Sequence, residues 1–296
     1  MLNKSEYFEP IDPDEKNDEF IAIESKSFFK DVCERFVKNK RAMIALMAIF
    51  GPMISPYSYD GMDTAIMNQR PSTAHWFGTD RFGRDLFTRV LYGARISLMV
   101  GIVTAVINTI IGVIYGGIAG YVGGRVDMWM MRLTDILYSI PELLYIILIM
   151  LIFGSNVRSI IIGVCVAGWI SMARMVRSQI ITLKEQEFAL AAFVLGANSG
   201  RILFKHLIVN SLGTIIVTVT LMIPQAIFME AFLSFVGVGI SAPMASLGTL
   251  AQDARTYLEI FPYQMLFPVA AICVTIFSLN FIGEGLNSAL NPKGKR

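Results

Sequence analysis

Charged residues are scarce in this sequence. Asp, Glu, Lys and Arg make up 16% of the 296 residues, whereas hydrophobic residues make up 54%. So apolar a composition excludes an ordinary soluble domain and is typical of a polytopic membrane protein, with lipid as its surroundings. The formal net charge of +2 gives no general attraction to polyanions, so no nucleic-acid partner is expected.

Cysteine and histidine are also few. Cys33, Cys165 and Cys273 are scattered along the chain, and this spacing gives neither a disulfide framework nor a metal site. We interpret them as packing thiols. His75 and His206 are isolated from each other in the sequence, so no two-histidine metal site is expected.

Catalytic motifs are missing. The sequence has no phosphate-binding loop of the GxxxxGK[ST] type, no Gly-x-Ser-x-Gly elbow and no HExxH pair. No nucleophile stands beside a plausible base. We therefore predict that the chain is not an enzyme and binds no cofactor of its own. Its N-terminus is acidic and polar, which does not fit a cleaved signal peptide of the usual form.

Long apolar runs, in contrast, are abundant and predict an all-α fold with six transmembrane helices. The expected spans are residues 42–54, 96–121, 133–153, 157–175, 207–235 and 265–286. The first is short, because 13 residues give roughly 20 Å of helix against a hydrocarbon core of about 30 Å. Extension through Tyr59 brings it to a marginal length.

The remaining segments complete the predicted organisation. Residues 1–41 form a cytoplasmic tail with an interfacial amphipathic helix over 26–41, which could alternatively pack on protein. Residues 42–94 hold the first span and an extracytoplasmic loop, residues 95–290 the main transmembrane domain, and residues 291–296 a basic cytoplasmic end. This topology places 18 Lys and Arg residues inside and seven outside, as the positive-inside tendency requires, with both termini in the cytoplasm.

A glycine recurs at every fourth position of the second span. The residues are Gly112, Gly116, Gly120 and Gly124. A stripe of this kind lets another helix approach closely, so we assign it to helix–helix packing and to no chemistry.

Four residues of the third and fifth spans are candidates for a translocation path: Asp135, Glu142, Pro224 and Glu230. Asp135 and Glu142 are seven residues apart and are expected to share one helix face. Carboxylates inside a membrane usually point into the bundle or a wet cavity. The alternative is an interfacial or paired structural role, and Pro224 predicts a kink.

The loop before the second span mixes charges of both signs. Asp80, Arg81, Arg84 and Asp85 lie close together and favour ion-paired turns, so we expect a folded loop stabilised by salt bridges. Direct contact with a transported substrate is the alternative.

The polar stretch 182–210 interrupts the apolar runs. Residues 187–195 predict a short helix ended by Gly196, and Asn198 or Ser199 can cap a second helix. An apolar face of the first helix comprises Phe188, Ala191, Ala192 and Leu195. A helix apolar on nearly all sides must be covered, either by its own chain or by a groove on a partner.

Four motif blocks in this chain resemble those of one known family. They are Ala191-Ala192-x3-Gly196 with residues 202–210, the string FGTDxxGRDxxxRxxxGAR over 77–95, DILYSIPELL over 135–144, and the segment that begins at Glu230 and reads EAFLSFVGVG. They are similar to ABC importer permeases of the oligopeptide, dipeptide and nickel branch. Leu190, Phe193, Val209 and Leu247 depart from the family's usual residues.

The resemblance implies the transmembrane-domain fold of type I ABC importers, with a cytoplasmic coupling helix between the fourth and fifth spans. It implies four kinds of partner at a bacterial cytoplasmic membrane: a second homologous permease chain, two cytoplasmic ATPase subunits that use ATP and Mg, an extracytoplasmic solute-binding protein that delivers oligopeptides, and membrane lipid. The residues that match the family's ATPase-docking loop are Glu187, Phe188, Leu190, Ala191, Ala192, Gly196, Ala197, Arg201 and His206.

Two other functions stay open at this point. One is a secondary transporter that uses Asp135, Glu142 and Glu230 as a proton or ion relay, although no inverted repeat is visible. The other is a membrane scaffold that transports nothing.

Overall fold

The computed structural model describes residues 55–241 and 244–290, all of which belong to the second of two compact units, residues 41–296. The predicted amphipathic helix, the core of the first span and the basic end lie outside the described residues. Within the described part, regular structure is helical apart from one isolated bridge between Thr79 and Asp85.

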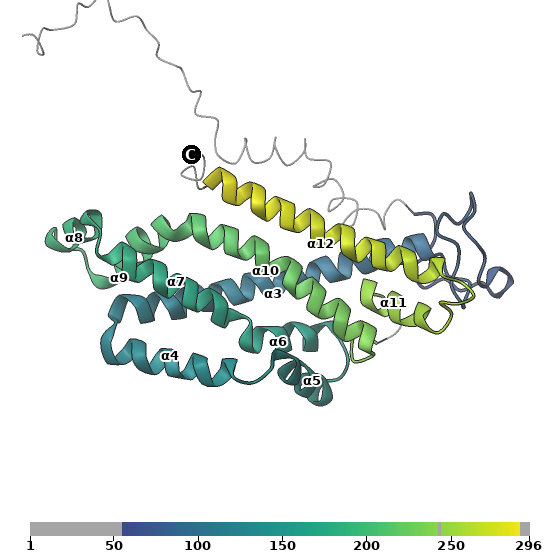
Figure 1. Cartoon of the computed structure of the whole chain (residues 1–296), viewed down its shortest axis with the longest axis horizontal. Helices are drawn as coiled ribbons and strands as arrows, with labels where there is room; N and C mark the ends of the chain where they lie inside the picture. Colours follow the sequence, from purple (N-terminus) through teal and green to yellow (C-terminus); the bar gives the residue numbers. More distant parts are fainter. Residues whose placement is uncertain (1–54, 242–243, 291–296) are drawn as a thin grey trace, which may run out of the picture. The chain divides into compact units, whose positions relative to one another are not determined.

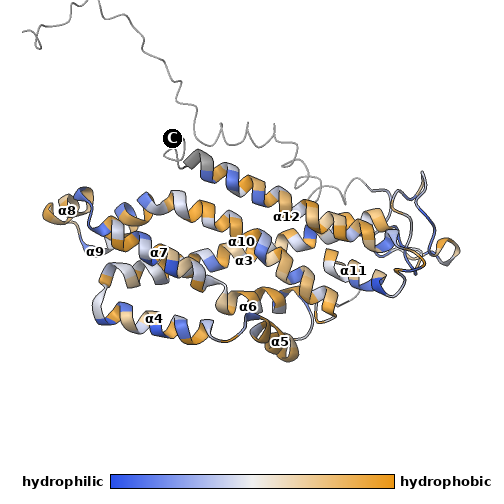
Figure 2. Cartoon of the chain, in the orientation of Figure 1, coloured by the Kyte–Doolittle hydropathy of each residue, from blue (hydrophilic) through white to orange (hydrophobic). Residues whose placement is uncertain are grey.

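Three long helices run side by side through this unit: α3 (Leu86–Val122), α10 (Ile208–Val236) and α12 (Tyr263–Leu290). A fourth rod consists of α6 (Val157–Ala167) and α7 (Trp169–Lys184). Within the described residues, four helical segments are long and apolar enough to cross a membrane, namely Leu86–Val122, Val157–Lys184, Ser199–Val236 and Tyr263–Asn287. Figure 2 shows hydrophobic residues along these helices.

The predicted third span is not one continuous helix. The structure divides it into α4 (Gly124–Tyr138) and α5 (Glu142–Phe153), whose axes differ by 74°. Pro141 has an extended ψ of 129° and lies at the N-cap of α5, where its missing N–H breaks the helical ladder. Counting the bent pair as one span gives up to five spans in the described part, so the predicted total of six stays a prediction.

The glycine stripe packs α3 against α7, as predicted. A Cβ atom on Gly112 would lie 2.6 Å from Met172, and one on Gly120 would lie 2.8 Å from the Arg177 carbonyl oxygen. Gly124 does not belong to this seam, because nothing lies within 4 Å of its Cβ position. It begins α4 with a φ of +56° instead, so the fourth glycine serves a turn.

The end of the unit opposite α8 (Glu187–Val194) is formed by residues 55–85, which include η2 (Thr64–Ile66), and by α11 (Leu247–Arg255). The prediction of a folded, ion-paired loop is confirmed: Arg84 Nε donates to Asp80 Oδ2 over 2.7 Å, and His75 Nδ1 lies 2.9 Å from Asp85 Oδ2. Leu247, which departs from the family pattern, is fully buried in a core with Leu86 and Leu250.

Candidate functional site: a helical tip and a cavity

The tip of the molecule is built by a short helix between two tight connections. Helix α8 ends where Gly196 adopts a φ of +82°, and the N–H groups of Gly196 and Ala197 donate to the carbonyl oxygens of Phe193 and Ala192. The predicted glycine stop is thus confirmed. Asn198 Oδ1 then accepts a 2.8 Å hydrogen bond from the Arg201 N–H and caps α9 (Ser199–Arg201).

The buried face of α8 differs from the predicted one. Ala189 and Ala192 are buried against Ile202, Leu203 and Leu207, whereas Leu195 is 86% exposed. Ala191 and Phe188 are also exposed. The reason is steric: the turns around α8 hold it close to residues 202–207, and only small side chains fit into that narrow contact.

Much of the apolar surface of α8 is left uncovered by the described residues. Phe193 is 69% exposed and Val194 82%, and Leu190 is exposed as well. We call Leu190, Phe193, Val194 and Leu195 the apolar tip. Contiguous exposed apolar side chains are typical of binding surfaces.

The other predicted docking residues flank this tip. Glu187 begins α8, Arg201 is exposed in α9, and Ala197 and His206 are half-buried. Residues Ile202–Leu207 form a π-helical turn, η3, that leads into α10. No sequence signal revealed this wider turn, which is frequent at functional positions of helices.

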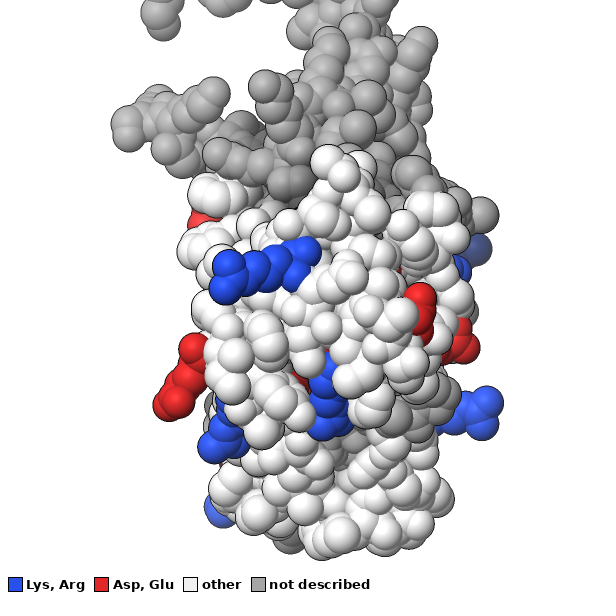
Figure 3. Space-filling view, turned by 90° about the vertical axis from the view of Figure 1, so that its right-hand side faces the viewer, with Lys and Arg blue, Asp and Glu red and all other residues white. Residues whose placement is uncertain are grey.

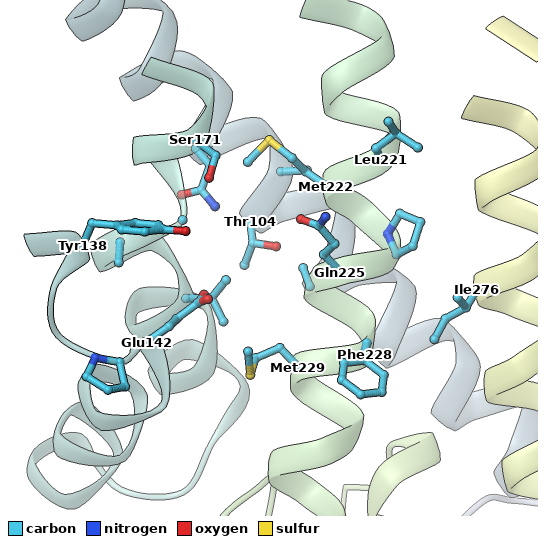
Figure 4. Close-up of a pocket in the computed structure, with 18 of the residues that line it drawn as sticks. Thr104, Tyr138, Glu142, Ser171, Leu221, Met222, Gln225, Phe228, Met229 and Ile276 are labelled. Carbon is cyan, nitrogen blue, oxygen red and sulfur yellow. The ribbon is translucent and has the colours of Figure 1, made fainter. Parts of the chain in front are cut away.

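The second feature is a cavity of about 880 Å³ in the middle of the helical unit. Thr104 of α3, Glu142 of α5 and Gln225 of α10 point into the same space (Figure 4). Ser171 of α7 lines it as well. Its volume lies within the range of about 300–1,000 Å³ that is usual for small-molecule sites.

The lining combines flexible apolar side chains with a few polar ones. Met222, Met229 and Phe228 supply apolar surface, and the polar lining residues are Thr104, Asn108, Tyr138, Glu142, Ser171, Gln225 and Asn280. Glu142 is the one ionisable carboxylate among the described lining residues, and no Lys or Arg lines the cavity. Thioether side chains adapt to varied ligand shapes, so the cavity suits neutral or cationic groups of variable outline.

The structure separates the four predicted path residues. Glu142 and Pro224 line the cavity. Asp135 does not, since it is exposed and pairs with Arg174 over 2.8 Å. The predicted shared face of Asp135 and Glu142 is wrong, because the 74° bend lies between them.

Glu230 lies outside the cavity lining too. It is fully buried between helices, where it accepts hydrogen bonds from Ser97 (2.6 Å) and Ser234 (2.9 Å). The three carboxylates proposed for an ion relay therefore form no continuous cluster. Among the described residues, no group of three or more His, Cys, Asp or Glu side chains could hold a metal ion.

Comparison with known proteins relates this architecture to transport. Residues 112–296 match the family described as binding-protein-dependent transport system inner membrane component. Residues 27–71 match the N-terminal TM domain of oligopeptide transport permease C.

Relatives that match over nearly their full length are also permease proteins of transport systems. The chain is 47% identical to the oligopeptide transport system permease protein OppC of Bacillus subtilis, over 97% of this chain and 96% of the relative. It is 46% identical to the dipeptide transport system permease protein DppC of the same organism, over 95% and 92%. It is 44% identical to OppC of Escherichia coli, over 94% and 95%. The resemblance seen in the motifs is confirmed: the chain belongs to the family of binding-protein-dependent transport system inner membrane components.

Proposed function

We propose that this chain is the oligopeptide permease subunit of an ATP-driven importer, and that the apolar tip docks it to a separate ATPase subunit. The observation that carries the docking role is the exposure of Phe193, Val194 and Leu195 at the end of a helix that the hydrogen-bonded turn at Gly196 and Ala197 terminates. An amphipathic helix that lays its apolar surface into a groove is a common docking mode.

The connections of α8 suggest how docking is linked to the cavity. Helix α7 precedes α8 and contributes Ser171 to the lining, and η3 follows α8 and leads into α10, which contributes Pro224 and Gln225. Ala189 and Ala192 pack on η3, so α8 moves with its neighbours. A displacement imposed at the tip therefore reaches both walls of the cavity as a rigid-body movement.

In this proposal the cavity is this chain's part of the peptide path, and a second homologous permease chain supplies the rest. Both termini and α8 lie in the cytoplasm, six spans cross the membrane, and an extracytoplasmic binding protein delivers peptide at the opposite end. ATP and Mg are used by the two ATPase subunits. An ion relay receives no support, because Asp135, Glu142 and Glu230 are held in three separate environments.

The test uses two glycines of the same segment. Gly196 has a φ of +82°, where an Asp side chain strains the backbone, whereas a Cβ atom on Gly200 in α9 would meet only Asn198 Oδ1, at an ordinary contact distance of 3.8 Å. Strain of this kind costs about 1–3 kcal/mol, enough to displace the tip. We expect Gly196→Asp to leave membrane insertion intact but to abolish ATPase co-purification and peptide uptake, and Gly200→Asp to behave as wild type. Wild-type uptake by Gly196→Asp would overturn the docking role.

A further inference from the structure

Three arginines and two aspartates form a cluster at the end of the unit opposite α8. Arg81 and Arg84 come from the loop, Arg89 from the first turns of α3, Asp80 from the loop and Asp253 from α11. We call these five residues the arginine cluster. Figure 3 shows this end of the molecule, where basic and acidic side chains lie within a mostly uncharged surface.

The arginine cluster is poorly satisfied internally. Arg84 makes one short contact, 2.7 Å from its Nε to Asp80 Oδ2. The contacts of Arg81 and Arg84 with Asp253 are longer, at 3.6 and 3.8 Å. The three guanidinium groups of the cluster outnumber its two carboxylates, and Asp60, which lines the adjoining cavity, supplies the third carboxylate nearby.

Among the described residues, unmatched buried donors lie on two arginines of the cluster, one on Arg81 (Nε) and two on Arg89. Arg89 is only 2% exposed. Its Nε lies 3.7 Å from Asp80 Oδ2, and its Nη2 lies 3.9 Å from Asp253 Oδ2. Both distances are too long for a hydrogen bond. Nε and Nη1 have no hydrogen-bond partner in the part of the chain that the structure describes. Buried donors are normally satisfied, and a buried arginine without an acceptor is costly.

A cavity of about 540 Å³ adjoins these groups. Arg81, Arg84, Arg89 and Asp253 line it, together with Gln252 of α11. Asp60 lies on the exposed rim, where it accepts a hydrogen bond from Ser58. The cavity is therefore large enough for a small ligand and offers cationic donors at its buried side.

We propose that this cavity binds a carboxylate, and that its ligand is the C-terminal carboxylate of a peptide on its way into the permease. Guanidinium groups bind carboxylates through two parallel hydrogen bonds, and the cavity is lined by three of them, from Arg81, Arg84 and Arg89. The carboxylates of Asp60, Asp80 and Asp253 would repel a dianion, so the cavity favours an anion with a single charge. The peptide as the source rests on the proposed function, whereas the carboxylate site does not.

The test uses the assembled permease complex in nanodiscs without its binding protein. The probes are trialanine, trialanine amide, acetate and acetamide, and the measurement is the apparent Kd from the ligand-dependent melting temperature. We expect trialanine to bind and its amide to have no effect. Arg89→Gln should weaken trialanine binding at least about tenfold, the loss expected when a charged hydrogen-bond partner is removed. Arg95→Gln, an exposed arginine of the same helix, is the matched control.

Arg81→Gln is a second test variant, in case Arg89→Gln misfolds. The side chain of Arg81 also lines the cavity but is 40% exposed, so its replacement disturbs the fold less. It should weaken binding while leaving the ligand-free melting temperature unchanged. Equal effects of trialanine and its amide, or unchanged binding by both variants, would overturn the carboxylate site. Acetate binding as tightly as trialanine would assign the site to small free acids. Uptake is measured separately, in proteoliposomes that contain the complex together with its binding protein. Trialanine binding in nanodiscs without ATP-driven trialanine uptake in those proteoliposomes would refute the proposed function and leave the site intact.

Discussion

Ser97 on α3 donates a 2.6 Å hydrogen bond to Glu230 on α10, which joins two long helices at a point from which solvent is excluded. Ser234, one turn further along α10, donates to the other carboxyl oxygen over 2.9 Å. The buried carboxyl group of Glu230 is thus held by serine hydroxyl groups, among which Ser246 before α11 is a third partner. This arrangement explains Glu230 as a structural residue.

A first prediction concerns that contact. Glu230→Ala leaves these hydroxyl groups without their acceptor and opens a cavity, so we expect it to lower the free energy of unfolding by about 2–4 kcal/mol. Glu230→Gln keeps an acceptor oxygen and should retain most of the stability and wild-type uptake. The measurement is the melting temperature in detergent together with peptide uptake. Stable Gln variant protein with no uptake would show that Glu230 acts in transport.

A second prediction concerns the glycine seam between α3 and α7. A Cβ atom on Gly116 would clash with the Ala173 backbone, whereas one on the adjacent Gly117 would only touch Leu203 and Ile208 at 3.6 Å or more. We expect Gly116→Ala to destabilise the protein by about 1–3 kcal/mol and Gly117→Ala to be neutral. Melting temperatures of the two variants measure this, and equal values would contradict the seam.

A third prediction concerns the beginning of α3. Asp85 Oδ1 accepts hydrogen bonds from the Thr88 N–H (2.7 Å) and hydroxyl group (2.6 Å), and Oδ2 lies 2.9 Å from His75. Asp85→Ala removes this cap and should cost about 1–2 kcal/mol. Asp85→Asn should cost less, because its side-chain oxygen can still cap the helix. The comparison requires unfolding measurements on both variants, and equal stability of Asp85→Ala and wild type would refute the capping role.

A fourth prediction concerns the peptide path. Glu142 is the one carboxylate among the described residues that line the 880 Å³ cavity, so Glu142→Gln removes its attraction for cations. We expect uptake of a lysine-containing peptide to fall about fivefold relative to a neutral peptide, the effect of losing roughly 1 kcal/mol of charge interaction. Asp135→Asn, on the exposed α4, is the control and should leave the ratio unchanged. An unchanged ratio in Glu142→Gln would argue against this path.

The sequence predicted those features of the fold and the site that depend on residues close together in the chain. The stop at Gly196, the cap at Asn198 and the packing of Gly112, Gly116 and Gly120 follow from local geometry and periodicity, and the structure has them. The ion-paired loop was likewise predictable, because its charges are close neighbours in the sequence.

The wrong or missing predictions concern features that depend on packing between segments far apart in the sequence. The third span appeared continuous because its composition is apolar on both sides of Pro141, but the break there turns Asp135 and Glu142 in different directions. On α8, periodicity cannot tell which apolar face meets the chain itself, and the small Ala189 and Ala192 are selected by closeness to η3. Asp253 joins Arg81, Arg84 and Arg89 only through the fold, so no pattern within the loop revealed the arginine cluster.

The most direct test of the account is site-specific photocrosslinking in the assembled complex. A photoreactive amino acid at Leu195, which is 86% exposed at the apolar tip, is compared with one at Arg95. Arg95 is exposed on the N-terminal part of α3. We predict an ATPase crosslink from position 195 and none from position 95. A crosslink to the binding protein from position 195, or the absence of any ATPase crosslink there in a complex that transports peptide, would contradict it.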